Sequence, residues 1–493
     1  MSQSKISQSA RIRTRLKHPV IDSDGHTLEA MPVFLDYLKS VAGARAADRY
    51  GSAMFDTFLD PRWSTFSSQE RRDRRTLRPT WWAVPMKNTL DLATAMMPKL
   101  MHERLDEMGL DFSVVYPTLG LLTIALEDDE LRRASARALN TMKAEMFGEY
   151  SDRLTPAAVI PMHTPEEAID ELQYAVTNLD LKVAMVASYV RRPIPKAARE
   201  FPDAARYTYW LDTYGLDSQY DYDPFWQKCV ELRVVPTFHS VGYGWGSRTS
   251  ISNYVHNHIG NFAASAEAIC KGLLLGGVPA RFPTLRFAFL EGGAVWARSL
   301  YCELLSHWKK RNRAAMENYN PANMDRAIFV TLAQRYGGMV LAEKAERLAD
   351  LYQSAGTDPT LIDEWAQSGI GCAEDIRDLF SDRFFFGCEG DDPLNLVAFD
   401  PMGTPFETQL HAFYGSDIGH WDVPEMREVL EEACELVEKG LMNEDQLREF
   451  VFANPVELWT SSNPNFFKDT VVESEVNKLL SDQGKAKAAA RTG

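Results

Sequence analysis

Residues 233–239 read Arg-Val-Val-Pro-Thr-Phe-His, a short apolar run that ends in a polar residue. Short runs of this kind, rich in β-branched and aromatic residues, are typical of buried strands. Seven similar runs occur along the chain, and the stretches between them have the spacing of amphipathic helices. The eight predicted strands are residues 19–24, 111–117, 157–161, 181–186, 233–239, 285–291, 383–387 and 411–417.

Strands that alternate with helices predict βα units around a parallel sheet. Helical spacing is clearest over residues 129–150, 165–179, 294–310 and 424–439. Because eight strands is the number that a closed (β/α)₈ barrel requires, we predict an α/β fold of the TIM-barrel type.

The chain of 493 residues is longer than a minimal barrel. We predict a barrel over residues 19–460 with insertions at about 34–108 and 312–380, the second helical over 325–356. Residues 1–18 are expected to form a disordered arm, and 461–493 a C-terminal extension with a frayed end. Because loops after barrel strands line the active-site mouth, both insertions are candidates for a lid. Trp63, Trp81 and Trp82 in the first insertion are interpreted as local packing, with stacking on a substrate as the alternative.

Composition excludes several kinds of partner. Apolar residues make up 45% and charged residues 25%, as in a globular protein. The net charge of −16 argues against a nucleic-acid partner, and the basic run at residues 71–75 is interpreted as a solvated loop. No run of about 18 apolar residues predicts a membrane span, and residues 1–18 lack the apolar core of a secretory signal. The six cysteines form no C-x-x-C pair, so we expect free thiols and a cytoplasmic protein.

Ionisable residues fall at the ends of four predicted strands. The first strand ends in Asp24, with His26 two residues later, the fifth ends in His239, the sixth in Glu291 and the eighth in Asp417. The carboxyl ends of all the strands lie on one face of a barrel, and the active sites of barrel enzymes are found on that face. Each residue alone has a structural explanation, as a hydrogen-bonded histidine or a helix cap, but their combination predicts a metal site. Imidazole and carboxylate suit zinc, iron or manganese.

Two more histidines, His256 and His258, follow the fifth strand. With Glu291 and Asp24 they could complete a second metal site, or they could be surface or capping residues of a helix. His420 lies three residues after Asp417 and is predicted to orient it or to contact substrate. Arg191, with Arg192 beside it, is a candidate clamp for a substrate carboxylate, with solvent exposure as the alternative.

Several motifs resemble the amidohydrolase-related family, the branch of the amidohydrolase superfamily around aminocarboxymuconate-semialdehyde decarboxylase. Residues 236–239 carry one of them, and residues 277–293 carry the sequence Arg-Phe-Pro-Thr-Leu before a strand that ends in Glu-Gly-Gly. Residues 21–29 read Ile-Asp-Ser-Asp-Gly-His-Thr-Leu-Glu, and residues 415–421 read Gly-Ser-Asp-Ile-Gly-His-Trp. The similarity extends to about residue 460.

The resemblance implies a barrel with a divalent metal that activates water or anchors a substrate carboxylate. It supports Asp24, His26, His239 and Asp417 as ligands, with Asp24 in place of the more usual His or Glu. Decarboxylases of this family have a histidine where this chain has Glu291, which then is either a fifth ligand or a general base.

The leading hypothesis is a metal-dependent hydrolase of a small carboxylated or amide-containing molecule, with Glu291 or Asp417 as catalytic base and zinc as the expected metal. A non-oxidative decarboxylase and an oxygen-dependent hydroxylase with two iron or manganese ions are the alternatives. A non-catalytic partner subunit is the fourth reading. The resemblance also implies a homo-oligomer, with a hetero-oligomer as the alternative.

Overall fold

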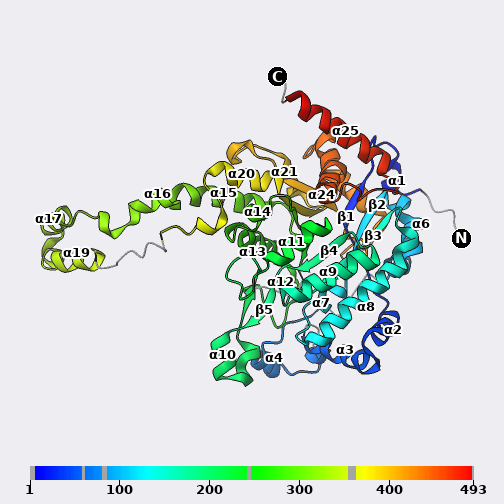
Figure 1. The fold of residues 1–493 in the computed structure, drawn as a ribbon, viewed down its shortest axis with the longest axis horizontal. Coiled ribbons are helices and arrows are strands. Elements are labelled where there is room, and N and C mark those ends of the chain that lie inside the picture. Colours follow the sequence, from blue (N-terminus) through cyan, green and yellow to red (C-terminus); the bar gives the residue numbers. More distant parts are fainter. Residues whose placement is uncertain are drawn as a thin grey trace.

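Eight parallel strands form the centre of the molecule. The structure is a computed structural model, and it describes residues 6–57, 61–79, 86–240, 246–353, 362–420 and 422–490. The strands follow one another in the order β1-β2-β3-β4-β7-β8-β9-β10 and are nearly closed into a barrel with helices around it (Figure 1). All eight correspond to the predicted strands, which confirms the TIM-barrel prediction. Their bounds are β1 Ile21–Thr27, β2 Phe112–Pro117, β3 Leu154–Ile160, β4 Val183–Ala187, β7 Pro236–His239, β8 Phe287–Phe289, β9 Phe384–Glu389 and β10 His411–Gly415.

The first and last strands meet through the residues that follow β10. The amide of Asp417 donates to the carbonyl of Asp24 at 2.9 Å, and the amide of His26 donates to the carbonyl of Ile418 at 2.6 Å. The backbones approach closely here, since a Cβ on Gly415 would lie 2.7 Å from the Cβ of Asp24. Glycine at 415 therefore permits the contact that closes the barrel.

Helices with one apolar face cover the outside of the barrel. α8 begins after an Asp128 cap and α9 after a Thr164 cap with proline at its first position, which are favourable helix starts. These two helices confirm the predictions for residues 129–150 and 165–179. The barrel helices include α8 Asp129–Phe147, α9 Pro165–Leu179, α11 Asp223–Leu232, α13 Asn261–Leu275, α15 Val295–Arg311, α20 Ala373–Asp382 and α22 Val429–Glu438.

The N-terminal segment is ordered from residue 6, which corrects the prediction of a disordered arm over residues 1–18. α1 (Gln8–Arg13) places Ile12 in the core, 3% exposed. Arg13 Nη2 donates to Asp111 Oδ1 at 2.9 Å. A buried side chain and a two-pronged ion pair hold this segment on the barrel; residues 1–5 lie outside the described part.

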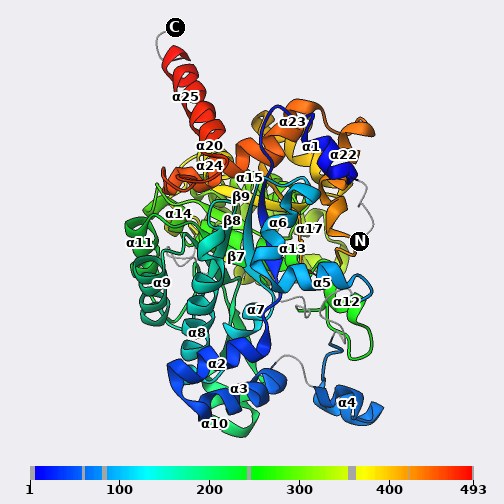
Figure 2. The ribbon, with the colours of Figure 1, turned by 90° about the vertical axis from the view of Figure 1, so that its right-hand side faces the viewer.

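The C-terminal extension also packs on the barrel before it leaves it. Phe466, Phe467 and Val472 are buried. The first turns of α25 (Glu473–Ala490) still pack on the barrel, with Val476 and Leu479 buried, and the rest of the helix projects away from the molecule (Figure 2). The end of the chain, predicted to be frayed, is helical up to Ala490.

The first insertion is helical and lies between β1 and β2. The basic run at residues 71–75 is mostly part of a helix, α4, rather than the predicted loop, although its side chains are largely exposed as expected. A hairpin of β5 (Val190–Pro193) and β6 (Tyr209–Asp212) after β4 was not predicted. The helices of the insertion are α2 Met31–Ala42, α3 Ala44–Thr57, α4 Ser68–Arg74, α5 Thr89–Met96 and α6 Pro98–Met108.

The second insertion forms an arm, residues 312–353, that extends sideways from the body of the molecule (Figure 1). It contains α16 (Arg313–Met316), α17 (Arg326–Tyr336), α18 (Gly338–Ala342) and α19 (Ala345–Gln353). It begins after α15 and not directly after a strand, so it leaves the barrel away from the strand ends. The predicted lid role is therefore wrong for this insertion. No helix among the described residues is long and apolar enough to cross a membrane.

Asp22 joins three strands inside the barrel. Its carboxylate accepts hydrogen bonds from Ser113 Oγ at 2.6 Å, from the Ser416 amide at 2.9 Å and from Ser416 Oγ at 2.7 Å. It also accepts one from the Asp24 amide at 3.1 Å. Burial raises the pKa of Asp22 to about 6, although these hydrogen bonds oppose the shift.

Replacement of Asp22 by alanine should destabilise the fold by roughly 3–5 kcal/mol, because it leaves buried donors without a partner. Urea unfolding followed by circular dichroism measures this. Glu103→Ala, whose side chain is 60% exposed, is the matched control and should change stability by less than about 0.5 kcal/mol. Equal stability of Asp22→Ala and the control would contradict the role given to Asp22.

Candidate metal centre

Five of the predicted site residues lie together at the carboxyl ends of the strands. Asp24 and His26 come from the last part of β1, and His239 is the last residue of β7. Glu291 follows β8 and Asp417 follows β10, each by two residues. The side chains of all five are at most 4% exposed.

The ligand-type atoms of these residues converge on a small volume. His26 Nε2 lies 3.5 Å from Asp24 Oδ1, 3.5 Å from Glu291 Oε1 and 3.4 Å from Asp417 Oδ1. His239 Nε2 lies 3.5 Å from Glu291 Oε1. Two overlapping sets, Asp24–His26–His239 and His26–Glu291–Asp417–His420, have their ligand atoms within 4.8 Å of one another.

His420, for which we predicted either orientation of Asp417 or contact with substrate, is part of this cluster and lies beside Asp417. Its Nδ1 lies 2.6 Å from Asp417 Oδ1 and 3.1 Å from Glu291 Oε1. Its ring stacks on that of His26 with centroids 3.5 Å apart. At 12% exposure it is the most accessible side chain of the cluster, so it remains a candidate for contact with substrate.

Buried polar atoms at the centre lack hydrogen-bond partners. They are Asp24 Oδ1, His26 Nε2, His239 Nε2, Glu291 Oε2 and Asp417 Oδ1. Buried polar atoms are nearly always satisfied, so an orphaned set of this size, all of ligand type, needs an explanation. A divalent cation of the Zn, Mn or Fe type fits the donor set because each atom is a lone-pair donor.

The pKa shifts of the carboxylates also indicate a site for a cation. Burial and the neighbouring Glu291 raise the pKa of Asp24 to about 7, against the opposing effect of His239. Burial and the nearby Asp422 and Glu291 raise the pKa of Asp417 well above its ordinary value. Three carboxylates in one buried pocket repel one another, and a cation would remove that repulsion.

His239 has its ring fixed by its own backbone neighbourhood. Its Nδ1 lies 2.9 Å from the carbonyl of Ser240, so Nδ1 is the protonated nitrogen and Nε2 keeps its lone pair toward the centre. This is the usual arrangement for a histidine ligand held by a backbone carbonyl.

Glu291 and Asp417 both have left-handed backbone conformations, with φ of 53° and 52°. This conformation costs a residue with a Cβ roughly 1–2 kcal/mol. Both residues follow a strand, and the left-handed conformation turns their side chains back over the barrel. Backbone strain of this kind is concentrated at functional sites.

His256 and His258 do not join the cluster. Both lie on α12 (Tyr254–His258), where His256 is exposed. The ring of His258 lies 5.3 Å from that of Phe262, which is 5.8 Å from His239. Phe262 thus stands between His258 and the centre, and among the described residues the structure assembles no second set of ligands around these histidines.

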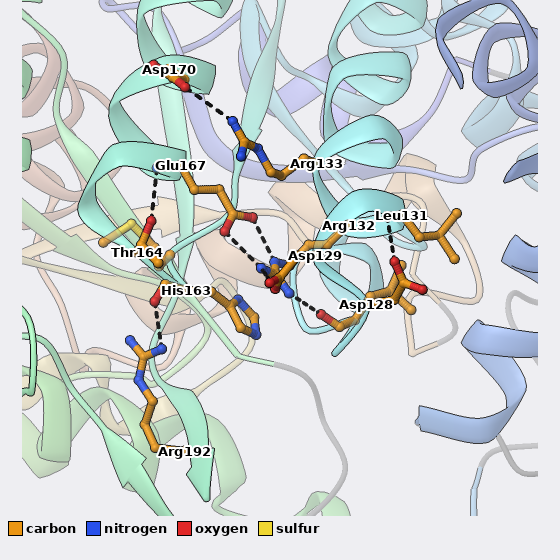
Figure 3. Close-up of polar contacts among 12 residues, drawn as sticks. Asp128, Asp129, Leu131, Arg132, Arg133, His163, Thr164, Glu167, Asp170 and Arg192 are labelled. Carbon is orange, nitrogen blue, oxygen red and sulfur yellow. Dashed lines mark hydrogen bonds and ion pairs between the residues drawn. The ribbon is translucent and has the colours of Figure 1, made fainter. Parts of the chain in front are cut away.

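Arg191 does not reach the cluster either. It is exposed on β5 with its guanidinium 5.0 Å from the ring centroid of Tyr209. The next residue, Arg192, is buried and donates to Asp212 Oδ2 at 3.0 Å. It also donates to the carbonyl of His163 at 2.6 Å (Figure 3). Alternation along β5 therefore turns Arg192 into a structural anchor and Arg191 toward solvent.

Glu389, at the end of β9, is a buried carboxyl group that the sequence analysis missed. It pairs across the sheet with Gly415, which touches Asp24. Burial and the nearby Glu291 raise its pKa to about 9. The predicted strand ended at residue 387; two more residues would have added Glu389 to the ionisable groups at strand ends.

The first insertion contacts the segment that follows β7. Trp63 Nε1 donates to the carbonyl of Ile251 at 3.0 Å, and the backbone amide of Arg78 donates to the carbonyl of Ser250 at 3.0 Å. The Trp63 ring lies under the guanidinium of Arg71 at 3.8 Å, a local cation–π contact. The insertion therefore lies on the side where the strands end, and Trp81 and Trp82 lie outside the described residues.

A (β/α)₈ barrel with a buried cluster of histidines and carboxylates at its strand ends defines a metal-dependent barrel enzyme. The amidohydrolase family model matches residues 101–338. Over this part, just under half of the chain, the predicted resemblance to the amidohydrolases is confirmed. The matched region contains His239 and Glu291, whereas Asp24, His26 and Asp417 lie outside it.

Solved structures with a similar fold share little sequence with this chain. An amidohydrolase from Mycobacterium avium subsp. paratuberculosis is 16% identical, with a TM-score of 0.49 over 90% of this chain and 100% of that one. A 5-carboxyvanillate decarboxylase from Novosphingobium aromaticivorans with bound manganese is 13% identical, with a TM-score of 0.49 over 90% and 97%. A dihydroxybenzoic acid decarboxylase from Polaromonas sp. JS666, also with manganese, is 14% identical, with a TM-score of 0.47 over 92% and 99%. No curated protein sequence matches the chain.

Addition of Zn²⁺ or Mn²⁺ to chelator-treated protein should raise its melting temperature by a few degrees, because an ion at 100 times its Kd stabilises the folded state by about 2.7 kcal/mol. Asp24→Asn keeps the shape of the side chain but removes its charge, and most of the shift should be lost. His256→Ala, at an exposed position, should keep the full shift. An undiminished shift in Asp24→Asn would contradict the assignment of Asp24 as a ligand.

Proposed function

We propose that this enzyme is a metal-dependent hydrolase that acts on a small carboxylated or amide-containing organic molecule. The observation that carries the proposal is the position of Glu291, a carboxylate within 3.5 Å of His26 and His239 and within 3.1 Å of His420. A carboxylate in the middle of a metal-type cluster is suited to take a proton from water.

Asp24, His26, His239 and Asp417 would hold the ion. Two histidines and two carboxylates suit zinc, which is the expected metal, and iron or manganese suit a site this rich in carboxylates as well. When bound, a divalent ion acts as a Lewis acid and brings the pKa of water toward 7.

Glu291 has the charge state that a base requires. Burial opposes ionisation, but the neighbouring imidazoles, that of His239 first, hold the pKa of Glu291 well below its ordinary value. Its Oε2 has no hydrogen-bond partner and remains able to accept a proton.

His420 would complete the proton path. The Nδ1 of His420 lies 2.6 Å from Asp417 Oδ1, which leaves its Nε2 able to take up a proton or to give one to a leaving group. Asp417 fixes the tautomer and orientation of the imidazole, in the way a carboxylate supports a catalytic histidine. This assigns proton transfer to Glu291 and His420 and orientation to Asp417.

A non-oxidative decarboxylase is the second candidate, and the position of His420 favours it. Family decarboxylases use a histidine at the position of Glu291. In this chain the His420 imidazole contacts the Glu291 carboxylate at 3.1 Å and could supply the same acid and base function. A substrate carboxylate would then bind at the metal and leave as CO₂, while His420 protonates the carbon.

A screen of carboxylated aromatic compounds and amides in ¹⁸O-water separates the two reactions. Hydrolysis should place ¹⁸O in the product without CO₂ release, whereas decarboxylation should release CO₂ without that label. Release of CO₂ as the main product would replace the first proposal by the second.

Glu291→Gln should lower kcat by roughly 10²–10⁴-fold, the usual contribution of a general base. Elemental analysis in parallel shows whether the variant still binds metal. Glu267→Gln on α13, a half-exposed carboxylate that pairs with Lys271, is the control and should keep full activity. Full activity of a metal-loaded Glu291→Gln enzyme would exclude Glu291 as the base.

A further inference from the structure

Three basic residues lie together at the amino ends of neighbouring strands, on the face of the barrel opposite the candidate metal centre. Arg286 directly precedes β8, Arg383 directly precedes β9, and His411 is the first residue of β10. We call these three residues the basal cluster. Phe287 pairs with Phe384 in parallel register, and the Phe287 amide donates to the carbonyl of Arg383 at 2.9 Å. The backbones of Arg286 and Arg383 therefore lie side by side, ~4.8 Å apart like those of paired strands.

The imidazole of His411 lies inside the amino end of the barrel. Phe384 and Phe386 on β9 contact Phe380 of the outer helix α20, so Phe385 between them faces the interior. His411 is the partner of Phe385 in the sheet, and the centroids of the two rings lie 4.7 Å apart. Its ring therefore lies at the bottom of the barrel, close to the strand ends that carry the two arginines.

Nitrogen atoms of the basal cluster lack partners. Arg286 Nε and His411 Nδ1 are buried and have no hydrogen-bond partner. Within the part of the chain that the structure describes, neither Arg286 nor Arg383 forms an ion pair with a carboxylate. Each of three other, buried arginines contacts a carboxylate at 3.0 Å or less: Arg104, Arg132 and Arg192. The basal arginines thus lack the counter-charge that the chain supplies to its other buried guanidinium groups.

The two guanidinium groups also repel each other. Burial and the neighbouring Arg383 lower the pKa of Arg286, and burial lowers the pKa of Arg383. The carboxylates of Asp382 and Glu457 oppose the shift at Arg286 but form no ion pair with it among the described residues. Asp382 is exposed, so water screens its charge. An anion between the guanidinium groups would remove the repulsion and supply the missing partners.

We infer that the basal cluster binds a small oxyanion of the phosphate type. A guanidinium group can donate two parallel N–H bonds to two oxygens of one phosphate, and two such groups side by side supply the charge for a dianion. His411 adds an imidazole nitrogen, which donates when it carries a proton. Three groups suit a single ion, because a nucleic acid needs an extended basic surface and the net charge of −16 argues against one.

The basal cluster is separate from the reaction proposed above. β9 has six residues, and at 3.3 Å per residue its two ends are roughly 17 Å apart. The carboxyl end carries Glu389, close to Glu291 of the candidate metal centre, whereas the amino end follows Arg383. An anion at the basal cluster would therefore stabilise the starts of β8, β9 and β10 without contact with substrate. Its readout is the stability of the protein and not its turnover.

Thermal unfolding in inorganic phosphate at constant ionic strength tests this inference. The melting temperature of the full-length protein should rise by a few degrees, because a ligand far above its Kd stabilises the folded state. Arg286→Gln and Arg383→Gln should each lose most of the rise. Arg311→Gln, at an exposed position on α15, is the matched control and should keep it. No rise in the wild-type protein, or an undiminished rise in both basal variants, would overturn the inference.

Titration calorimetry with phosphate locates the ion. One phosphate should bind per chain, and Arg286→Gln should weaken binding by about ten- to hundredfold, the loss expected for a charge-assisted hydrogen bond. Arg286→Lys keeps the charge and should bind more tightly than Arg286→Gln, which separates loss of the ion from damage to the fold. Asp24→Asn should leave the Kd unchanged. Loss of phosphate binding in Asp24→Asn would place the ion at the candidate metal centre and overturn the inference.

Discussion

The carboxylate of Asp22 is the point on which the candidate site depends. It binds Ser113 on β2 and both donor groups of Ser416, the residue that follows β10, so it holds the two neighbours of β1 in place. Asp24 lies two residues further along β1, and Asp417 directly follows Ser416. The position of two carboxylates of the metal cluster is therefore set by a third carboxylate that does not face the cluster. Since a buried charged group is tolerated only when it is well hydrogen-bonded, this arrangement leaves little freedom to the strand ends.

The metal cluster above Asp22 contains buried negative charge and unpartnered oxygen atoms. Buried carboxylates of Asp24, Glu291 and Asp417 lie within hydrogen-bonding range of the same histidine or close to it, and several of their oxygens have no partner. The left-handed backbone at Glu291 and Asp417 adds strain at the same place. Both features raise the free energy of the folded chain, and a bound cation would offset them. The groups that would bind the ion are therefore the same groups that carry this unfavourable free energy.

Much of the barrel and the cluster could be predicted from the sequence, because the strands are short apolar runs and the ionisable residues stand at their ends. Other features depend on contacts that a single segment does not reveal. Ile12 and Arg13 order the N-terminal helix through the core and through Asp111, and alternation along the unpredicted hairpin separates Arg191 from Arg192. Phe262 keeps His258 from the centre, and Glu389 was missed because a strand end is the least certain part of a prediction. The direction of the arm follows from its start after a helix, which no local pattern encodes.

The most direct test of the central claim is the metal content of the purified protein, measured by elemental analysis after expression in medium that supplies zinc, iron and manganese. A single cluster built on Asp24, His26, His239 and Asp417 predicts about one tightly bound ion per chain. About two ions per chain would show that a second set of ligands exists and would contradict the single-site account. Protein that holds no ion, even after reconstitution with each metal, would contradict the metal centre itself.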